Sequence, residues 1–130
     1  MVLDASAVVA LLLRSSTGAR VVDRIRDPED VIHVPHLMFV EVAQVLRRHV
    51  QAGVITADRG RRSVVYLGDL SAARHSHEPL LGRMWELRDN LTAYDAAYVA
   101  LAESLEAPLV TLDAKLANAP GHQAQIELLE

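Results

Sequence analysis

Residues 92–113 read TAYDAAYVALAESLEAPLVTLD and contain the clearest helix and strand of the chain. The segment Thr92–Leu105 is rich in alanine and apolar nearly all round, which predicts a buried helix. Ala107-Pro108 ends this helix, because proline cannot continue it and restricts the residue before it. Leu109–Thr111 is a short apolar run typical of a buried strand, and Asp113 follows it. A buried helix followed by a buried strand predicts one unit of a parallel sheet covered by helices.

The same alternation extends over the rest of the chain. Strands are predicted at Met1–Leu3, Val31–Val34, Ala72–His75 and Ile126–Leu129. Helices are predicted at Ser6–Leu13, Ala19–Arg26, Leu37–Ala52, Thr56–Leu70 and Leu80–Leu87, with a short turn of helix at Ala114–Asn118. Ser6 and Thr56 are the expected N-caps of their helices. The pattern indicates a three-layer α/β/α sandwich with a short-stranded parallel sheet, whose strand order is not readable from the sequence.

The length and composition set limits on the kind of protein. A chain of 130 residues predicts one domain spanning residues 1–130. There is no cysteine, which excludes disulfides, thiolate nucleophiles and cysteine-ligated zinc. The apolar segment Met1–Leu13 lacks a positive n-region and contains Asp4, so it is unlike a signal peptide. With no continuous apolar run of about 20 residues, we expect an unprocessed cytoplasmic protein.

The charge balance argues against a generic nucleic-acid binder. The formal net charge is −4, whereas such binders are usually strongly basic. Taking four cation-binding carboxylates from the 17 acidic side chains leaves 13, which equals the number of Lys and Arg residues. The acidity is therefore consistent with one local site.

Four acidic residues are expected to meet at one edge of the sheet. Asp4 closes the first strand, and Asp113 follows Leu109–Thr111. Glu41 lies in the first turns of the helix after the second predicted strand, and Asp95 lies in the first turn of a helix that we expect to follow a strand. In a right-handed βαβ unit, strands end and the next helices begin at the same edge, where ligands bind.

Two of these acids are badly placed for a solvated surface. Glu41 and Asp95 lie among apolar residues, and neither has Lys or Arg three or four positions away. Burying a carboxylate costs several kcal/mol unless it is paired or bound to a metal. Carboxylates packed together repel, which raises their pKa values until a cation compensates. Oxygen ligands select Mg²⁺ or Mn²⁺ over zinc, and such an ion can activate water and stabilise a leaving oxygen.

Each acid taken alone also has a structural interpretation. Asp95 fits the third position of a capping box that begins at Thr92. Asp4 and Asp113 fit the usual role of aspartate in starting a turn after a strand. Glu41 has no comparable explanation, since helix propensity does not favour an acid among apolar residues. The metal-site hypothesis depends on the four residues together.

Three segments of the chain resemble a known family. They are VLDASAVVALLL at residues 2–13, PHLMFVEVAQVL at 35–46 and LTAYDAAYVALAESLEAPLVTLDAKLA at 91–117. In order and spacing the chain resembles a PIN-domain ribonuclease, specifically a VapC-type toxin of a type II toxin–antitoxin system. The resemblance implies a PIN-like fold and a metal site made by Asp4, Glu41, Asp95 and Asp113. It also implies that the Ser6 hydroxyl holds a metal-bound water or a phosphate, with Thr92 and Thr111 as hydroxyl residues near the site.

The resemblance further implies an activity and partners. The family consists of Mg²⁺- or Mn²⁺-dependent endoribonucleases that cleave single-stranded or loop RNA in the cytoplasm and inhibit translation. A homodimer is implied, neutralised by a cognate antitoxin that commonly extends a basic side chain into the acidic pocket.

Other residues are candidates for contacts with RNA or protein. An electrostatic grip on the RNA backbone is a hypothesis for Arg47, Arg48, Arg59, Arg61 and Arg62. The alternative is that arginines near a helix C-terminus simply favour the helix dipole. Trp85 is interpreted as a packing residue, and a dimer or antitoxin contact is the alternative. The six histidines show no zinc-ligand spacing and are interpreted as structural or surface residues.

Two other functions remain open at this stage. A small phosphatase of the haloacid-dehalogenase type also has an aspartate after its first strand, but its chemistry needs a second aspartate two residues later, where this chain has Ser6. A protein-binding module without catalysis could use the acidic pocket to receive an arginine of its partner. The complete set of four acids argues against that module, and metal-dependent turnover separates the two.

Overall fold

The apolar strand segments pair into a parallel sheet of five strands. The computed structural model describes residues 1–130 and orders the strands β3-β2-β1-β4-β5. The strands are β1 (Val2–Leu3), β2 (His33–Pro35), β3 (Ala73–His75), β4 (Leu109–Thr111) and β5 (Ile126–Leu128). All neighbouring pairs are parallel, and Leu3 lies opposite Val110 where β1 meets β4. The central strand β1 is fully buried, as expected for a sheet covered on both faces.

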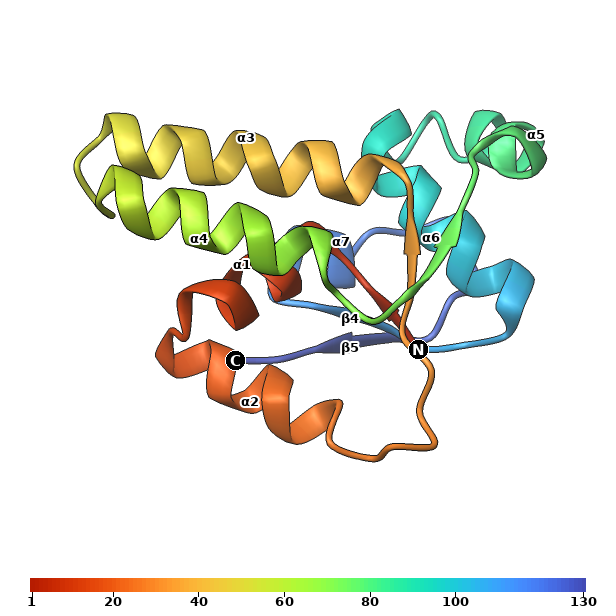
Figure 1. The fold of residues 1–130 in the computed structure, drawn as a ribbon. Helices are drawn as coiled ribbons and strands as arrows, with labels where there is room; N and C mark the ends of the chain where they lie inside the picture. Colours follow the sequence, from red (N-terminus) through yellow and green to blue (C-terminus); the bar gives the residue numbers. More distant parts are fainter.

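Seven α-helices surround this sheet (Figure 1). They are α1 (Ala5–Leu13), α2 (Ser16–Arg24), α3 (Leu37–Gln51), α4 (Ala57–Gly68), α5 (Leu81–Glu86), α6 (Ala93–Leu105) and α7 (Ala114–Ala117), with a 3₁₀ turn η1 (Glu78–Leu80) before α5. Helix α6 packs against β1, β2 and β4, while α1 packs against β4 and is surrounded by α2, α3 and α4. In Figure 1, α3 and α4 run side by side as a long helical pair. The predicted α/β/α fold is confirmed.

The best predicted helix is also the most deeply buried one. Every residue of α6 from Ala96 to Ala102 is buried, because its apolar surface extends all round. Its N-cap is Thr92, whose hydroxyl accepts a hydrogen bond from the Asp95 amide at 3.2 Å. Thr56 caps α4 in the same way, as predicted from the sequence.

Two predicted element boundaries are wrong at the N-terminal end. Asp4, not Ser6, is the N-cap of α1, because the carboxylate after β1 reaches the Ala7 amide at 3.0 Å. Helix α2 begins at Ser16, three residues before its predicted start. Gly18 lies inside its first turn. A Cβ on Gly18 would lie 2.1 Å from a backbone oxygen of α1, so the glycine permits close packing of the two helices.

The second strand begins later than predicted. Val31 is exposed, and its carbonyl accepts a hydrogen bond from the ammonium of Met1 at 2.9 Å. Pairing with β1 and β3 therefore starts at His33.

No single helix is long and apolar enough to cross a membrane. Helices α1 and α2 reach that length and composition only when they are taken together, and they meet at an angle of 111°.

Candidate metal centre

Asp4 and Asp113 follow the ends of adjacent parallel strands. Asp4 comes directly after β1, and its backbone amide donates to the Val110 carbonyl of β4 at 3.2 Å. Asp113 comes two residues after β4 and is the N-cap of α7, where its carboxylate accepts from the Lys115 amide at 2.8 Å. The predicted convergence of these two acids at the carboxyl edge of the sheet is therefore present.

The Asp4 carboxylate is buried and held by three donors. Asp4 as a whole is only 6% exposed. Oδ1 accepts from the Ser6 hydroxyl at 2.6 Å and from the Ala7 amide at 3.0 Å. Oδ2 accepts from the Thr111 hydroxyl at 2.5 Å. These bonds fix both oxygens of a carboxylate that has no cationic partner.

Two hydroxyl groups join the ends of β1 and β4. Thr111 Oγ1 accepts from the Asp113 amide at 2.9 Å, and Ser6 Oγ accepts from the Leu112 amide at 3.0 Å. Both hydroxyls also donate to Asp4. Ser6 and Thr111 therefore orient Asp4 relative to the loop that carries Asp113, which places two of the predicted supporting residues at the site.

Glu41 lies in the second turn of α3 and is half-buried. Its Oε1 accepts a hydrogen bond from the hydroxyl of Tyr98 at 2.6 Å. Tyr98 lies on α6, three residues after Asp95, so the two side chains share one face of that helix. Tyr98 is not among the site residues predicted from the sequence. A buried tyrosine hydroxyl usually needs a hydrogen-bond partner. A tyrosine in a helix predicted to be buried was therefore the signal that could have identified Tyr98 as a partner of a polar site residue.

Asp95 occupies the third position of α6 and is half-buried. The preceding elements are η1 and α5, so the expected strand directly before this helix is absent. Its amide is capped by Thr92, which confirms that part of the capping interpretation. Burial raises the pKa of its carboxylate, and the charges of Asp113 and Asp4 raise it further. The local cap and the shared acidic site therefore coexist.

The four acids form one electrostatic group. Burial raises the pKa of Asp4, Glu41 and Asp95, and in each case another acid of the group raises it further. Asp113 acts on Asp4 and Asp95, while Asp95 and Asp4 act on Glu41. None of the four forms an ion pair with Arg, Lys or His. The group is thus a concentration of negative charge without a compensating protein cation.

The donor set fits a hard divalent cation. Four carboxylates with no nitrogen or sulfur ligand match the preference of Mg²⁺ and Mn²⁺ for oxygen. No three of the His, Asp and Glu side chains stand close enough together to form a ready-made metal cage. A cation would offset both the burial and the repulsion that raise the three pKa values.

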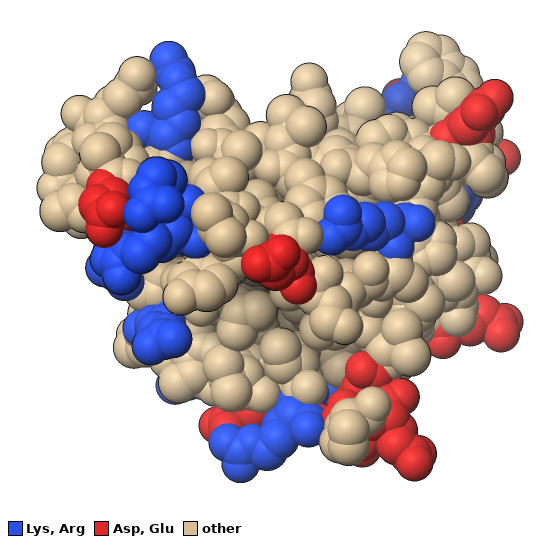
Figure 2. Space-filling view, viewed as in Figure 1, with Lys and Arg blue, Asp and Glu red and all other residues tan.

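The arginines predicted to contact RNA lie on the helical pair and not among the acids. Figure 2 shows Lys and Arg side chains gathered at the left of the view, where α3 and α4 are joined. Arg61 and Arg62 pair with Asp58 at 3.0 and 3.1 Å, and Arg59 donates to the Leu13 carbonyl. Arg47 and Arg48 are exposed near the end of α3. Contact with RNA remains a prediction for all five residues.

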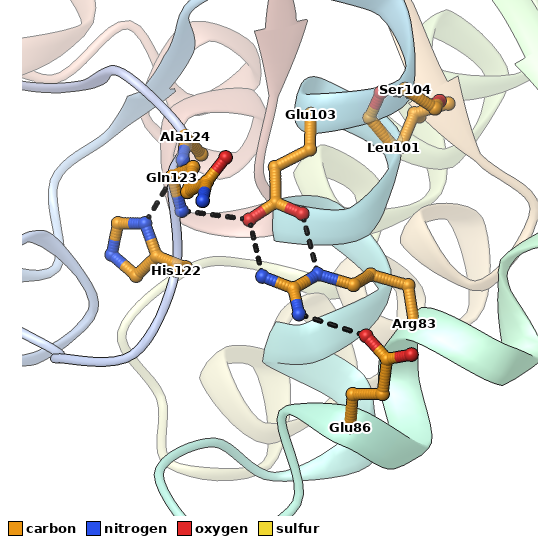
Figure 3. A network of polar contacts seen from close by, with 8 residues as sticks. All are labelled: Arg83, Glu86, Leu101, Glu103, Ser104, His122, Gln123 and Ala124. Atoms are coloured by element: carbon orange, nitrogen blue, oxygen red, sulfur yellow. Dashed lines mark hydrogen bonds and ion pairs between the residues drawn. The ribbon is translucent and has the colours of Figure 1, made fainter.

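Helix α6, which carries Asp95 and Tyr98, is anchored at its other end. Figure 3 shows the guanidinium of Arg83 between two glutamates. Arg83 and Glu86 are on α5, and Glu103 is on α6. Arg83 contacts Glu103 through two nitrogens, at 2.7 and 3.1 Å. Glu103 also accepts from the Gln123 amide at 2.9 Å, which ties the loop before β5 to the same helix. This network holds α6 in place relative to its neighbours.

Comparison with known proteins identifies a family for this arrangement. A model of the PIN domain matches residues 1–121. The chain is 41% identical to the ribonuclease VapC12 of Mycobacterium tuberculosis over 129 residues, which cover 99% of this chain and 98% of that protein.

Solved structures have the same fold. The crystal structure of PAE2754 from Pyrobaculum aerophilum superposes with a TM-score of 0.72 at 25% identity, covering 96% of this chain and 81% of that one. VapBC2 from Rickettsia felis, solved bound to a DNA fragment from its promoter, superposes with a TM-score of 0.72 at 12% identity and covers 99% and 98% of the two chains.

Proposed function

Because the chain belongs to the PIN domain family, we propose that it is a metal-dependent endoribonuclease that acts as the toxin of a toxin–antitoxin pair. The observation that carries this proposal is the grouping of Asp4, Glu41, Asp95 and Asp113 from four different parts of the fold, without a protein cation. The ribonuclease names of relatives about 40% identical support the reaction class.

In this proposal the four carboxylates hold Mg²⁺ or Mn²⁺. Such a cation supplies Lewis-acid activation of water and charge stabilisation at the leaving oxygen of an RNA phosphodiester. Ser6 and Thr111 keep the Asp4 carboxylate oriented through their short hydrogen bonds. Thr92 fixes the start of α6 and with it the position of Asp95. The basic residues of the α3–α4 pair are proposed to attract the RNA backbone through charge alone.

The proposed partners are RNA, a cognate antitoxin and a second copy of the chain. The VapC names of the relatives support the toxin assignment, and inhibition of translation is its proposed cellular effect. Trp85 is 69% exposed, so its interpretation as a packing residue is wrong. Exposed tryptophan is enriched at protein interfaces, which supports its use in a homodimer or antitoxin contact.

The test is RNA cleavage by the purified protein free of antitoxin. We expect cleavage of single-stranded or loop RNA with Mn²⁺ or Mg²⁺ and none after EDTA. Asp95→Asn should remove cleavage because it takes one carboxylate from the site. Asp89→Asn is the matched control, since Asp89 is exposed and lies outside the acidic group.

Two outcomes would contradict the proposal. Equal cleavage by the Asp95→Asn variant would refute the site assignment. A folded wild-type protein that cleaves nothing in a broad RNA panel would instead favour a protein-binding module whose acidic pocket receives an arginine.

A further inference from the structure

Tyr98 is a buried polar residue with a defined partner. It is 1% exposed and lies within the run of buried residues from Ala96 to Ala102 on α6. Its hydroxyl donates to Glu41 Oε1 at 2.6 Å. Since the other side chains in this run are alanine, valine and leucine, Tyr98 contributes the single polar side-chain group of the segment.

The restraint on Glu41 differs from the restraints on the other acids. Asp4 accepts three hydrogen bonds, and Asp113 is fixed by its role as the cap of α7. The Tyr98 hydroxyl is the one donor to the Glu41 side chain, and Oε2 has no protein donor. A glutamate also has more rotatable bonds than an aspartate, so it loses more side-chain entropy when it is held in one orientation.

The hydrogen bond joins two helices that each carry an acid of the group. Glu41 is on α3, whereas Tyr98 and Asp95 are on the same face of α6. Binding Oε1 leaves Oε2 available to a cation. A hydrogen bond of this kind orients a metal ligand and holds it in place before the ion arrives.

We propose that Tyr98 is a positioning residue that holds the Glu41 carboxylate ready for the divalent cation. This inference rests on the metal site of the proposed function. It concerns the affinity of the site and the orientation of one ligand, and it assigns Tyr98 no contact with RNA.

The first experiment measures Mn²⁺ binding by isothermal titration to metal-free protein. Tyr98→Phe keeps the buried ring and removes only the hydroxyl. We expect its Mn²⁺ affinity to fall by about tenfold or more, as is usual when a group that orients a metal ligand is lost. Tyr66→Phe is the matched control, because Tyr66 is exposed on α4, and its affinity should equal that of the wild type.

A double-mutant cycle tests whether Tyr98 acts through Glu41. In the Glu41→Gln background the ligand charge is already lost, so adding Tyr98→Phe should change Mn²⁺ affinity little further. Full additivity of the two losses would contradict action through Glu41. Wild-type affinity in Tyr98→Phe alone would overturn the inference and leave the metal site intact.

A measurement on the wild-type protein covers the case in which Tyr98→Phe does not fold. The chain has three tyrosines, so ¹³Cζ-tyrosine labelling gives three signals, which Tyr66→Phe and Tyr94→Phe assign by elimination. Adding Mg²⁺ should shift the Tyr98 signal and leave the Tyr66 signal in place. A Tyr98 signal that stays unchanged while Mg²⁺ binds would contradict the inference. A wild-type protein that binds neither ion would refute the metal site itself.

Discussion

Replacing Asp4 by asparagine is expected to abolish cleavage and yet to stabilise the metal-free protein. Asparagine is also a good N-cap, and its Oδ1 can accept from Ser6 and Ala7 as the carboxylate does. Its amide group would face the Thr111 hydroxyl, which can act as acceptor. The fold is therefore retained while one charge of the acidic group is removed.

The size of the effect follows from the opposing contributions at Asp4. Two hydrogen bonds to a charged acceptor become bonds to a neutral one, and the bond with Thr111 reverses direction, at a loss of about 1 kcal/mol each. The buried carboxylate no longer has to lose its hydration, which is worth several kcal/mol, and it no longer repels Asp113. The raised pKa of Asp4 indicates that burial and repulsion outweigh the hydrogen bonds. We expect a net gain of about 1 kcal/mol, or about 3 to 5 °C in melting temperature.

The assay is thermal unfolding in EDTA and in excess Mn²⁺. When free Mn²⁺ is at about 100 times its Kd, the free energy of unfolding of the wild-type protein should rise by about 2.7 kcal/mol. The rise for Asp4→Asn should be much smaller. Asp89→Asn, at an exposed position, should follow the wild type in both buffers. A metal-free Asp4→Asn protein that melts several degrees below the wild type would refute the reasoning, because the charge would then stabilise the fold unaided.

Three further outcomes are expected from the structure. Gly18→Ala should cost about 2 to 3 kcal/mol in chemical denaturation, because its Cβ would lie 2.1 Å from a backbone oxygen of α1, whereas Gly68→Ala meets no atom within 4 Å and should be tolerated. Glu103→Gln should cost about 1 to 2 kcal/mol by weakening its ion pair with an arginine of α5, while Glu86→Gln, with a side chain 66% exposed, should cost less than about 0.5 kcal/mol. Thermal melts across pH should show metal-free stability falling as the pH rises above about 4 to 4.5, because the folded pKa values of three site acids are raised and their contribution is lost on ionisation. Excess Mn²⁺ should remove this fall in stability. A fall that persists when the ion is bound would contradict the assignment of these acids to the metal site.

Much of the fold could be predicted because the local signals agree with the tertiary structure. The strand Leu109–Thr111 has its predicted bounds, and the helix predicted at Thr92–Leu105 starts one residue later, since their apolar patterns and breaker residues are unambiguous. The start of α2 was missed because Gly18 normally weakens a helix, and only the close approach of α1 explains its presence. The order of the strands depends on which segments pair over long distances, and no local pattern encodes that choice.

The candidate site was also predictable only in part. Asp4 and Asp113 were predictable because parallel strands end at a common edge. The partner of Glu41 was not predictable, because the contact with Tyr98 spans 57 residues and depends on how α3 and α6 lie against each other. The cap of α1 was assigned to Ser6 because serine is a common N-cap, whereas the structure uses Asp4 both as a cap and as a member of the acidic group.

The most direct test of the central claim is a crystal structure of the protein with Mn²⁺, located by its anomalous scattering. We expect an ion among Asp4, Glu41, Asp95 and Asp113, with carboxylate oxygens at about 2.1 Å. Strong Mn²⁺ density elsewhere, with none among these four side chains in protein that cleaves RNA, would contradict it.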